Sequence, residues 1–221
     1  MPSQPWTLTR EHFLDEAETR QLLAGLEATA TADGSTSVFV DRLIIECLLW
    51  SGLQTSEFCR LQVKDVCLDN SACFTVSGKR DRRRLVYLPG QLNALLQTYI
   101  DDVRPALVAD APAPVDAFII NERGKAYERT ALYRRVTRIL KQHGFGERAS
   151  VQLLRHTYGY LAYKCSGSNL LFTQRQLGHA HPMVTAVYAQ FVEEDYGQIA
   201  NDVVNQLTQF DASQYSKGPS T

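Results

Sequence analysis

Four separated stretches of the 221-residue chain contain side chains that could carry out chemistry. Lys79 lies in a predicted turn, and Arg155 and His156 lie where a predicted helix begins. His179 follows the end of another predicted helix, and Tyr188 comes nine residues later. Lysine and arginine can hold an anion, histidine can exchange a proton, and tyrosine carries a hydroxyl group. Taken singly, each of these residues has an ordinary structural explanation, so only their combination can predict a function.

The distribution of charge along the chain favours a polyanionic ligand. The net charge is −1 overall, but residues 1–78 carry −6, residues 79–155 carry +7 and residues 156–221 carry −2. Two basic clusters dominate the middle section: 79–84 at the tip of a predicted hairpin, and 129–141 on a predicted helix. Such clusters are either a solvated surface or a contact surface for DNA. The candidate DNA contacts are Lys79, Arg80, Arg82, Arg83, Arg134, Arg135, Arg138 and Lys141.

Composition narrows the class of protein. Hydrophobic residues make up 44% of the chain, which is enough to bury a core and excludes wholesale disorder. No run of about 18 apolar residues occurs, and the N-terminus lacks the pattern of a signal peptide. The five cysteines are an odd number without a CxxC pair, which predicts buried, reduced thiols rather than disulfides or a zinc site. We therefore expect a cytoplasmic protein, associated with the nucleoid if it binds DNA.

Periodicity predicts a mainly α-helical fold with one small antiparallel β-sheet. The predicted strands are 73–76 and 84–88, which form a hairpin, and a brief strand at 117–120. The segment 29–37 is predicted to be a loop, and 110–114 a short rigid linker. Helices are predicted in the segments 6–28, 38–50, 55–61, 91–103, 130–143, 153–162, 172–178, 184–192 and 199–210.

Three motifs in order resemble the tyrosine recombinase (phage integrase) family. They are Leu-Leu-Arg-His-Thr at 153–157, Gln-Leu-Gly-His at 176–179 and Thr-Ala-Val-Tyr at 185–188. Upstream, Ser51–Leu61 is similar to the first arginine box of that family, and Gly78-Lys79 with 84–88 is similar to its lysine hairpin. The resemblance covers residues 7–200 and implies the catalytic-domain fold of these recombinases, in agreement with the helical pattern.

The resemblance implies a reaction and a role for each matching residue. Tyr188 would attack a DNA phosphodiester and form a 3′-phosphotyrosine, without a metal ion or other cofactor. Arg155 would be the second arginine that clamps the phosphate oxygens, and His179 would donate a hydrogen bond nearby. Lys79 would protonate the leaving 5′-oxygen.

Two positions depart from the family pattern. Gln54 stands where the family has its first arginine, and Gln152 where it has the histidine three residues before the second arginine. A glutamine amide is neutral, so Gln54 cannot supply a charge-assisted fork to a phosphate, and Gln152 cannot exchange a proton near neutral pH. Loss of one such donor costs about 10²–10³ in rate, and loss of a proton-transfer group about 10²–10⁴.

Three functions remain open from the sequence. The first is an impaired recombinase that binds DNA and acts in, or regulates, site-specific recombination. The second is an active recombinase in which another residue, such as Arg60, His156 or His181, compensates. The third is a protein-interaction module that no longer binds DNA.

The resemblance also implies a domain organisation and partners. We expect one catalytic-type domain over residues 1–210, without the N-terminal core-binding domain common in the family, and a flexible tail at 211–221. Val203, Val204, Leu207 and Phe210 form an apolar face on the predicted C-terminal helix. That helix either packs on its own domain or docks on a second copy or a partner recombinase on duplex DNA.

Overall fold

The computed structural model describes residues 7–69, 71–78, 83–109, 111, 113–193 and 195–215, with the backbone alone for 206–215. Its contacts divide the chain into two units, one ending at Ala189 and the other beginning at Gln190. The first unit contains every described residue that the sequence links to catalysis. The expected single domain over 1–210 and the tail at 211–221 stay predictions.

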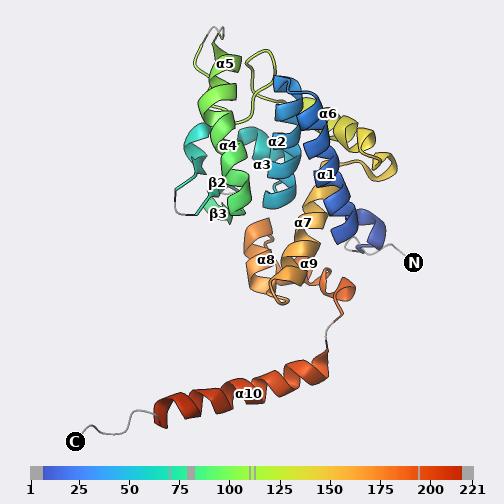
Figure 1. The fold of residues 1–221 in the computed structure, drawn as a ribbon, viewed down its shortest axis with the longest axis vertical. Helices are drawn as coiled ribbons and strands as arrows, with labels where there is room; N and C mark the ends of the chain where they lie inside the picture. Colours follow the sequence, from blue (N-terminus) through green and yellow to red (C-terminus); the bar gives the residue numbers. More distant parts are fainter. Residues whose placement is uncertain are drawn as a thin grey trace, which may run out of the picture. The chain divides into compact units, whose positions relative to one another are not determined.

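The first unit is mainly helical (Figure 1). Its α-helices are α1 (Glu16–Ala32), α2 (Thr36–Ser51), α3 (Thr55–Arg60), α4 (Asn93–Thr98), α5 (Arg104–Val108), α6 (Arg129–Gln142), α7 (Val151–Cys165), α8 (Leu170–Leu177) and α9 (Pro182–Ala186). The shorter turns are η1 (Arg10–His12), η2 (Val63–Asp65), η4 (Gly90–Leu92) and η6 (Gly146–Arg148), with a π-helical turn η5 (Tyr99–Val103). The turn η7 (Ala189–Phe191) begins at the last residue of this unit. The fold class expected from the sequence is confirmed.

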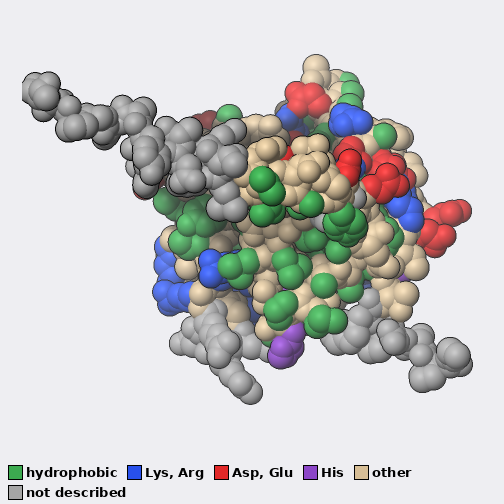
Figure 2. Space-filling view, turned by 90° about the horizontal axis from the view of Figure 1, so that it is seen from below, with side chains coloured by type: hydrophobic (Ala, Val, Ile, Leu, Met, Phe, Trp, Pro, Cys, Tyr) green, Lys and Arg blue, Asp and Glu red, His purple; other side chains and the backbone are tan. Residues whose placement is uncertain are grey.

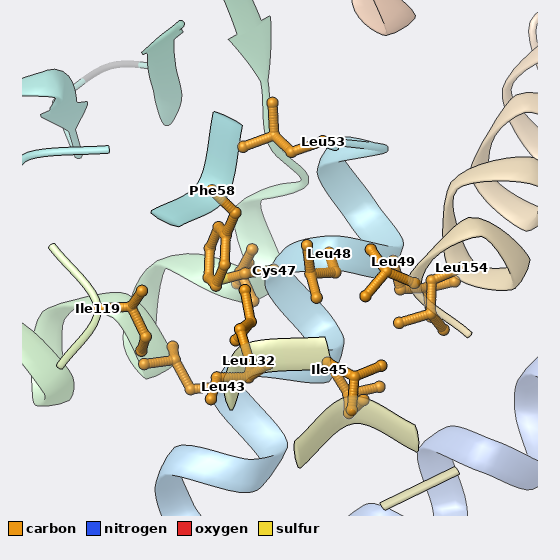
Figure 3. Close-up of a cluster of buried hydrophobic side chains, with 14 of the residues drawn as sticks. Leu43, Ile45, Cys47, Leu48, Leu49, Leu53, Phe58, Ile119, Leu132 and Leu154 are labelled. Atoms are coloured by element: carbon orange, nitrogen blue, oxygen red, sulfur yellow. The ribbon is translucent and has the colours of Figure 1, made fainter. Parts of the chain in front are cut away.

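Helix α2 is the centre of the hydrophobic core. Its side chains are apolar on almost every face, and Leu43, Ile45 and Leu48 are completely buried. Phe58 of α3 and Leu154 of α7 lie around this helix (Figure 3). A helix that is hydrophobic all round must be enclosed by other elements, so α2 is the scaffold against which the site-bearing helices pack.

The antiparallel sheet has the strand order β1-β2-β3, with β1 at Val66–Cys67, β2 at Cys73–Ser77 and β3 at Arg83–Tyr87. Thr75 pairs with Leu85, which confirms the predicted hairpin. Phe74 and Val86 point into the core, whereas Leu85 and Tyr87 are half exposed on the other face. The predicted strand at 117–120 is wrong, because that segment makes only isolated bridges, from Ala117 to Gln62 and from Ile120 to Ala126.

The first helix begins later than the sequence analysis expected. Thr9 precedes only the short turn η1, and α1 starts after Asp15. The Asp15 carboxylate accepts a hydrogen bond from the Glu18 amide (2.8 Å), and the Glu18 carboxylate accepts one from the Asp15 amide (3.0 Å). This reciprocal cap fixes the start of α1. The predicted loop 29–37 is also shorter, because α1 continues to Ala32 and α2 begins at Thr36.

The expectation of five buried thiols is only partly correct. Cys47 and Cys73 are buried, Cys59 and Cys67 are half-buried, and Cys165 is exposed, and all five are free thiols. Cys165 is exposed because it lies at the last residue of α7, beyond the face that packs on the core. Within the described residues, no helix is both long enough and apolar enough to cross a bilayer.

The second unit consists chiefly of α10, which runs over Tyr196–Tyr215. This helix is longer than the predicted 199–210 and takes in part of the segment expected to be a flexible tail. Ile199 and Val203 lie one helical turn apart, and they are 47% and 58% exposed. These two residues belong to the apolar face expected on this helix, and its docking on its own domain, a second copy or a partner stays a prediction.

Candidate active site

Helix α7 presents four site residues on one face. Ser150 caps the helix by accepting a hydrogen bond from the Leu153 amide (3.0 Å). Gln152 is followed by Arg155 three residues later, by His156 four residues later and by Gly159 seven residues later. Such spacings stack side chains along one side of an α-helix. Arg155 and His156, which carry the family resemblance in the motif at 153–157, therefore share one face of α7 with Gln152.

Tyr188 lies against this face of α7. It follows α9 rather than lying within the predicted helix 184–192, which is broken into α9 and η7. The Tyr188 side chain is 1% exposed, and its Oη is 3.0 Å from Nδ1 of His156. A Cβ atom at Gly159 would overlap the tip of the Tyr188 ring, so glycine at 159 allows the phenol to approach the α7 backbone. Burial raises the pKa of Tyr188 to about 12, partly offset by the positive charge of Arg155.

Arg155 is buried with its guanidinium anchored by two carbonyl groups. Nη1 donates to the Gly52 carbonyl, and Nη2 donates to the Leu177 carbonyl at 2.8 Å. These bonds use two of the five N–H groups of the guanidinium, so three are left for a ligand. Burial lowers the pKa of Arg155, and the charge of Glu57 opposes that shift. The guanidinium is thus fixed in place before any anion binds.

His179 is positioned by the turn after α8. Gly178 ends α8 with a left-handed backbone conformation (φ 68°), which reverses the chain into His179. A Cβ atom at Gly178 would lie 2.7 Å from the Arg84 guanidinium, so a larger residue would displace that side chain and would also be strained at this φ. Nδ1 of His179 is 2.8 Å from Oγ1 of Thr185, a buried residue of α9. Burial, aided by the charge of Arg155, lowers the pKa of His179 to about 4.

Gln54 caps α3 at the edge of the same site. Its exposed side chain lies two residues after Gly52, which adopts a left-handed conformation (φ 61°) and has no room for a Cβ because Tyr158 and Leu177 would lie within 2.7 Å of it. The backbone N–H of Gln54 donates to the Glu57 carboxylate (2.9 Å). The segment Ser51–Leu61 thus places the neutral side chain of Gln54 at the start of α3, at the position where the family has its first arginine.

A buried ion pair between Arg84 and Glu57 stabilises the elements around Gln54. Arg84 of β3 donates to both carboxylate oxygens of Glu57 (2.7 and 3.1 Å) and to the Gln176 carbonyl (3.2 Å). Burial favours the neutral acid, but the hydrogen bonds and charge of Arg84 outweigh it and lower the pKa of Glu57. The pair joins the sheet to α3 and α8.

The predicted residues meet in one cleft of about 440 Å³. Gln54, Gln152, Arg155, His179 and Tyr188 all line it. Arg155 is the only arginine or lysine among the described residues of the lining. Lys79 lies outside the described residues, so its position relative to the cleft stays a prediction. The cleft is lined by Thr7, Leu8, His12, Gln54, Gln152, Arg155, His156, His179, Val184, Val187 and Tyr188.

The candidate DNA contacts have different surroundings. Lys79, Arg80 and Arg82 lie outside the described residues, whereas Arg83, Arg134 and Lys141 are exposed. Arg138 is half exposed and bonds to the Asp41 carboxylate at 2.9 Å. These exposed cations stay predicted DNA contacts.

Arg135 is a correction to the predicted set. Its side chain is only 8% exposed, and its guanidinium binds Asp41, Glu122, Tyr127 and the Ser37 carbonyl. It ties α6 to α2 and to the loop before α6. A phosphate could reach it only by breaking this buried network, so we remove Arg135 from the DNA contacts.

Several site residues were not singled out by the sequence analysis. His12 contributes through a contact that joins distant segments, and no local pattern marks it. Thr185 begins the Thr-Ala-Val-Tyr motif, but its contact with His179 was not predicted. Glu57 could have been found from the sequence, because it lies three residues after Gln54 in the spacing of a capping box. Arg60 and His181, which were considered as compensating residues, are exposed and do not line the cleft. His156, considered with them, does line it.

A second, larger groove of about 590 Å³ lies along the other part of α7. Its lining is mainly apolar and includes Leu23, Trp50, Tyr87 and Phe172, but none of the predicted catalytic residues. Figure 2 shows hydrophobic side chains scattered among polar ones on the side seen from below in Figure 1. Among the described residues, no three histidine, cysteine or acidic side chains are grouped as metal ligands would be.

Known proteins with similar sequences are tyrosine recombinases. The chain is 28% identical to tyrosine recombinase XerH of Helicobacter pylori over 165 residues, which are 73% of this chain and 44% of that protein. It is 29% identical to tyrosine recombinase XerC of Anoxybacillus flavithermus over 184 residues, 83% of this chain and 59% of the relative. The chain thus spans about half the length of these relatives.

Solved structures show the same fold. XerH bound to a palindromic difH substrate in a post-cleavage complex superposes with a TM-score of 0.70 at 25% identity, covering 86% of this chain and 52% of that one. XerA recombinase superposes with a TM-score of 0.66 at 21% identity, covering 92% and 66%. The model of the phage integrase family matches residues 12–194, which is most of the chain. This chain therefore belongs to the phage integrase family, as do the tyrosine recombinases that it resembles.

Proposed function

We propose that this chain binds duplex DNA through the cleft beside α7 and acts in site-specific recombination as an impaired recombinase that cleaves DNA slowly. Tyr188 is the nucleophile, Arg155 holds the phosphate, and His179 donates a hydrogen bond to it. Lys79 protonates the leaving 5′-oxygen. The observation that carries the proposal is the meeting of Tyr188, Arg155 and His179 with the two glutamines in one cleft.

The charge of the cleft supports slow rather than ordinary cleavage. The pentacoordinate phosphorus of the transition state carries more negative charge than the bound diester, so it needs fixed positive groups around it. Arg155 supplies one such group, but Gln54 and Gln152 offer only neutral amides. Loss of one oxyanion donor costs about 10²–10³ in rate. The proposal of a contact surface for DNA is supported by the exposure of Arg83, Arg134 and Lys141.

Covalent trapping tests the proposal. The full chain is incubated with a pool of nicked duplexes of randomised sequence, so that cleavage releases a short fragment and leaves the protein bound covalently to the DNA. We expect slow formation of an adduct at Tyr188 and none with Tyr188→Phe. The captured sequence then serves for measurements of rate. Binding to duplex DNA that weakens steeply with salt is expected in both proteins.

Restoring the family residues provides the sharpest control. Gln54→Arg is expected to raise the rate of adduct formation by about 10²–10³, since it returns a charged fork to the cleft. If the natural protein cleaves DNA and neither Gln54→Arg nor Gln152→His raises the rate, the active recombinase is favoured instead. A chain without salt-dependent DNA binding would favour the interaction module.

A further inference from the structure

A chain of three side chains runs from the surface of α7 to the predicted nucleophile. Oη of Tyr188 is 3.0 Å from Nδ1 of His156, and Nε2 of the same imidazole is 3.0 Å from the side-chain nitrogen Nε2 of Gln152. Gln152 lies one helical turn before His156, so both are fixed by the same rigid helix. The imidazole therefore bridges a polar amide on one side and the reacting hydroxyl on the other.

The groups around His156 keep its ring neutral. Arg155 is adjacent on α7, the His12 ring of η1 lies with its centroid 6.4 Å away, and His179 faces it from the turn after α8. Burial, followed by the charges of Arg155 and His12, lowers the pKa of His156 to about 4. A neutral imidazole has one nitrogen that accepts a proton and one that donates. The phenol that it touches, by contrast, holds its proton tightly.

We propose that His156 is the general base that accepts the proton of the Tyr188 hydroxyl, and that Gln152 is a positioning residue that holds the imidazole ring for this step. The inference rests on the proposed function. It gives a definite step to His156, which the sequence offered only as one of three residues that could compensate, and to Gln152, which stands at the position of the family's histidine. With His156 as the base, the Tyr188 hydroxyl can lose its proton without a histidine at position 152.

The step balances as follows. Oη of Tyr188 bonds to phosphorus while its proton moves to Nδ1 of His156, which becomes imidazolium. The bond from phosphorus to the 5′-oxygen breaks, and that oxygen takes a proton from Lys79. On rejoining, the 5′-hydroxyl returns a proton to Lys79 and attacks phosphorus, and the leaving phenolate recovers its proton from His156. No oxidant, metal ion or nucleotide is consumed.

The tautomer is the central requirement. Nδ1 can accept the phenol proton only if Nε2 carries the hydrogen, which it would donate to the Gln152 amide oxygen. The 3.0 Å contact joins Nε2 of His156 to the amide nitrogen of Gln152, so the proposal requires the amide turned by 180°, with its oxygen facing the imidazole N–H. A bound phosphate adds negative charge near His156 and raises its pKa, so the base becomes stronger when DNA is present.

Single-turnover rates test the base. Adduct formation on the captured duplex is compared in the natural chain and in the Gln54→Arg variant, each with and without His156→Gln. The substituted amide keeps a polar side chain but cannot take up a proton. We expect a loss of about 10²–10⁴ in rate with unchanged DNA affinity. His181→Ala, which removes an exposed histidine outside the cleft, should change neither quantity.

The pH profile separates a base from a structural role. Above the pKa of His156 the natural chain should show a flat rate. In His156→Ala the rate should rise about tenfold per pH unit, because the phenolate must then form by itself, and added imidazole should restore cleavage. A rate that increases in His156→Gln would show instead that the hydrogen bond locks Tyr188, and would overturn the proposal.

A measurement without DNA separates this inference from the proposed function. Nitrogen NMR of the full chain should find Nδ1 of His156 unprotonated and Nε2 protonated. A protonated Nδ1 overturns the base whether or not DNA is cleaved. An adduct that forms equally fast without His156 overturns the base alone. No adduct from either the natural chain or Gln54→Arg, with DNA bound, overturns cleavage and the base together.

Discussion

At the scale of single residues, the position of Tyr188 depends on the absence of a side chain at 159. Gly159→Ala places a Cβ atom where the phenol ring lies. Overpacking of this kind costs about 1–3 kcal/mol, whereas the change from glycine to alanine inside a helix gains about 1 kcal/mol. We expect a net loss in the free energy of unfolding, measured with urea, together with loss of the covalent adduct.

The same clash can be removed by truncating the Tyr188 side chain. In a Tyr188→Ala background the space beside α7 is empty, so Gly159→Ala should become neutral or stabilising. Gly90→Ala is a matched control, since a Cβ there meets nothing within 4 Å. Equal destabilisation by Gly159→Ala in both backgrounds would contradict the close approach of the phenol to the helix.

The sequence predicted the residues of the cleft better than their surroundings. Arg155, His179 and Tyr188 were found because short motifs carry them, and their spacing on α7 and beyond is a local property. The partners of these residues are not local: Arg155 bonds to carbonyls of Gly52 and Leu177, more than twenty residues away in either direction. Such contacts depend on how helices pack, which a motif does not contain.

At the scale of elements, the Glu57–Arg84 pair should stabilise the junction of the sheet with α3 and α8. Arg84→Met leaves a largely buried carboxylate without its partner, which costs about 3–5 kcal/mol. The double variant Glu57→Gln with Arg84→Met should lose less than Arg84→Met alone, because no unpaired charge remains. Urea denaturation of the four proteins measures the coupling, and strictly additive losses would contradict it.

The same pair predicts a dependence on pH. The folded protein lowers the pKa of Glu57 below its ordinary value of 4.5. The stabilisation is therefore fully present above about pH 4.5 and is lost as the pH falls through the lower pKa of the folded state. The difference in unfolding free energy between the natural chain and Glu57→Gln should shrink over this range. A difference that does not change between pH 7 and pH 3 would rule out the lowered pKa.

Elements with strong local patterns were predicted well. Helix α2 is an apolar run that ends at a glycine, and the β2–β3 hairpin has alternating strands, so both lie close to their expected bounds. The start of α1 was missed because an Asp-x-x-Glu cap outweighed the earlier threonine. Arg135 was misplaced because a charge on an amphipathic helix normally faces water, and only the tertiary fold supplies its acidic partners.

At the scale of the whole molecule, α10 makes a prediction about assembly. A 20-residue helix gains little stability from its own backbone in water, and the first half of α10 exposes Ile199 and Val203. Burial of this face against a second copy would recover hydrophobic free energy, at about 25 cal/mol per Å² of apolar surface. We expect the full chain to form oligomers on DNA and a chain lacking residues 199–221 to bind as a monomer, as measured by light scattering.

A point variant separates the apolar face from the length of the helix. Val203→Asp puts a charge on the face and should reduce the mass of the complex on DNA as the deletion does. Asn201→Asp adds the same charge at an exposed polar position of the same helix, and should leave that mass unchanged. The thermal unfolding of the first unit should be the same in all three proteins, because its core ends before α10. If the full chain and the deletion both bind DNA as monomers, the helix does not dock on a second copy.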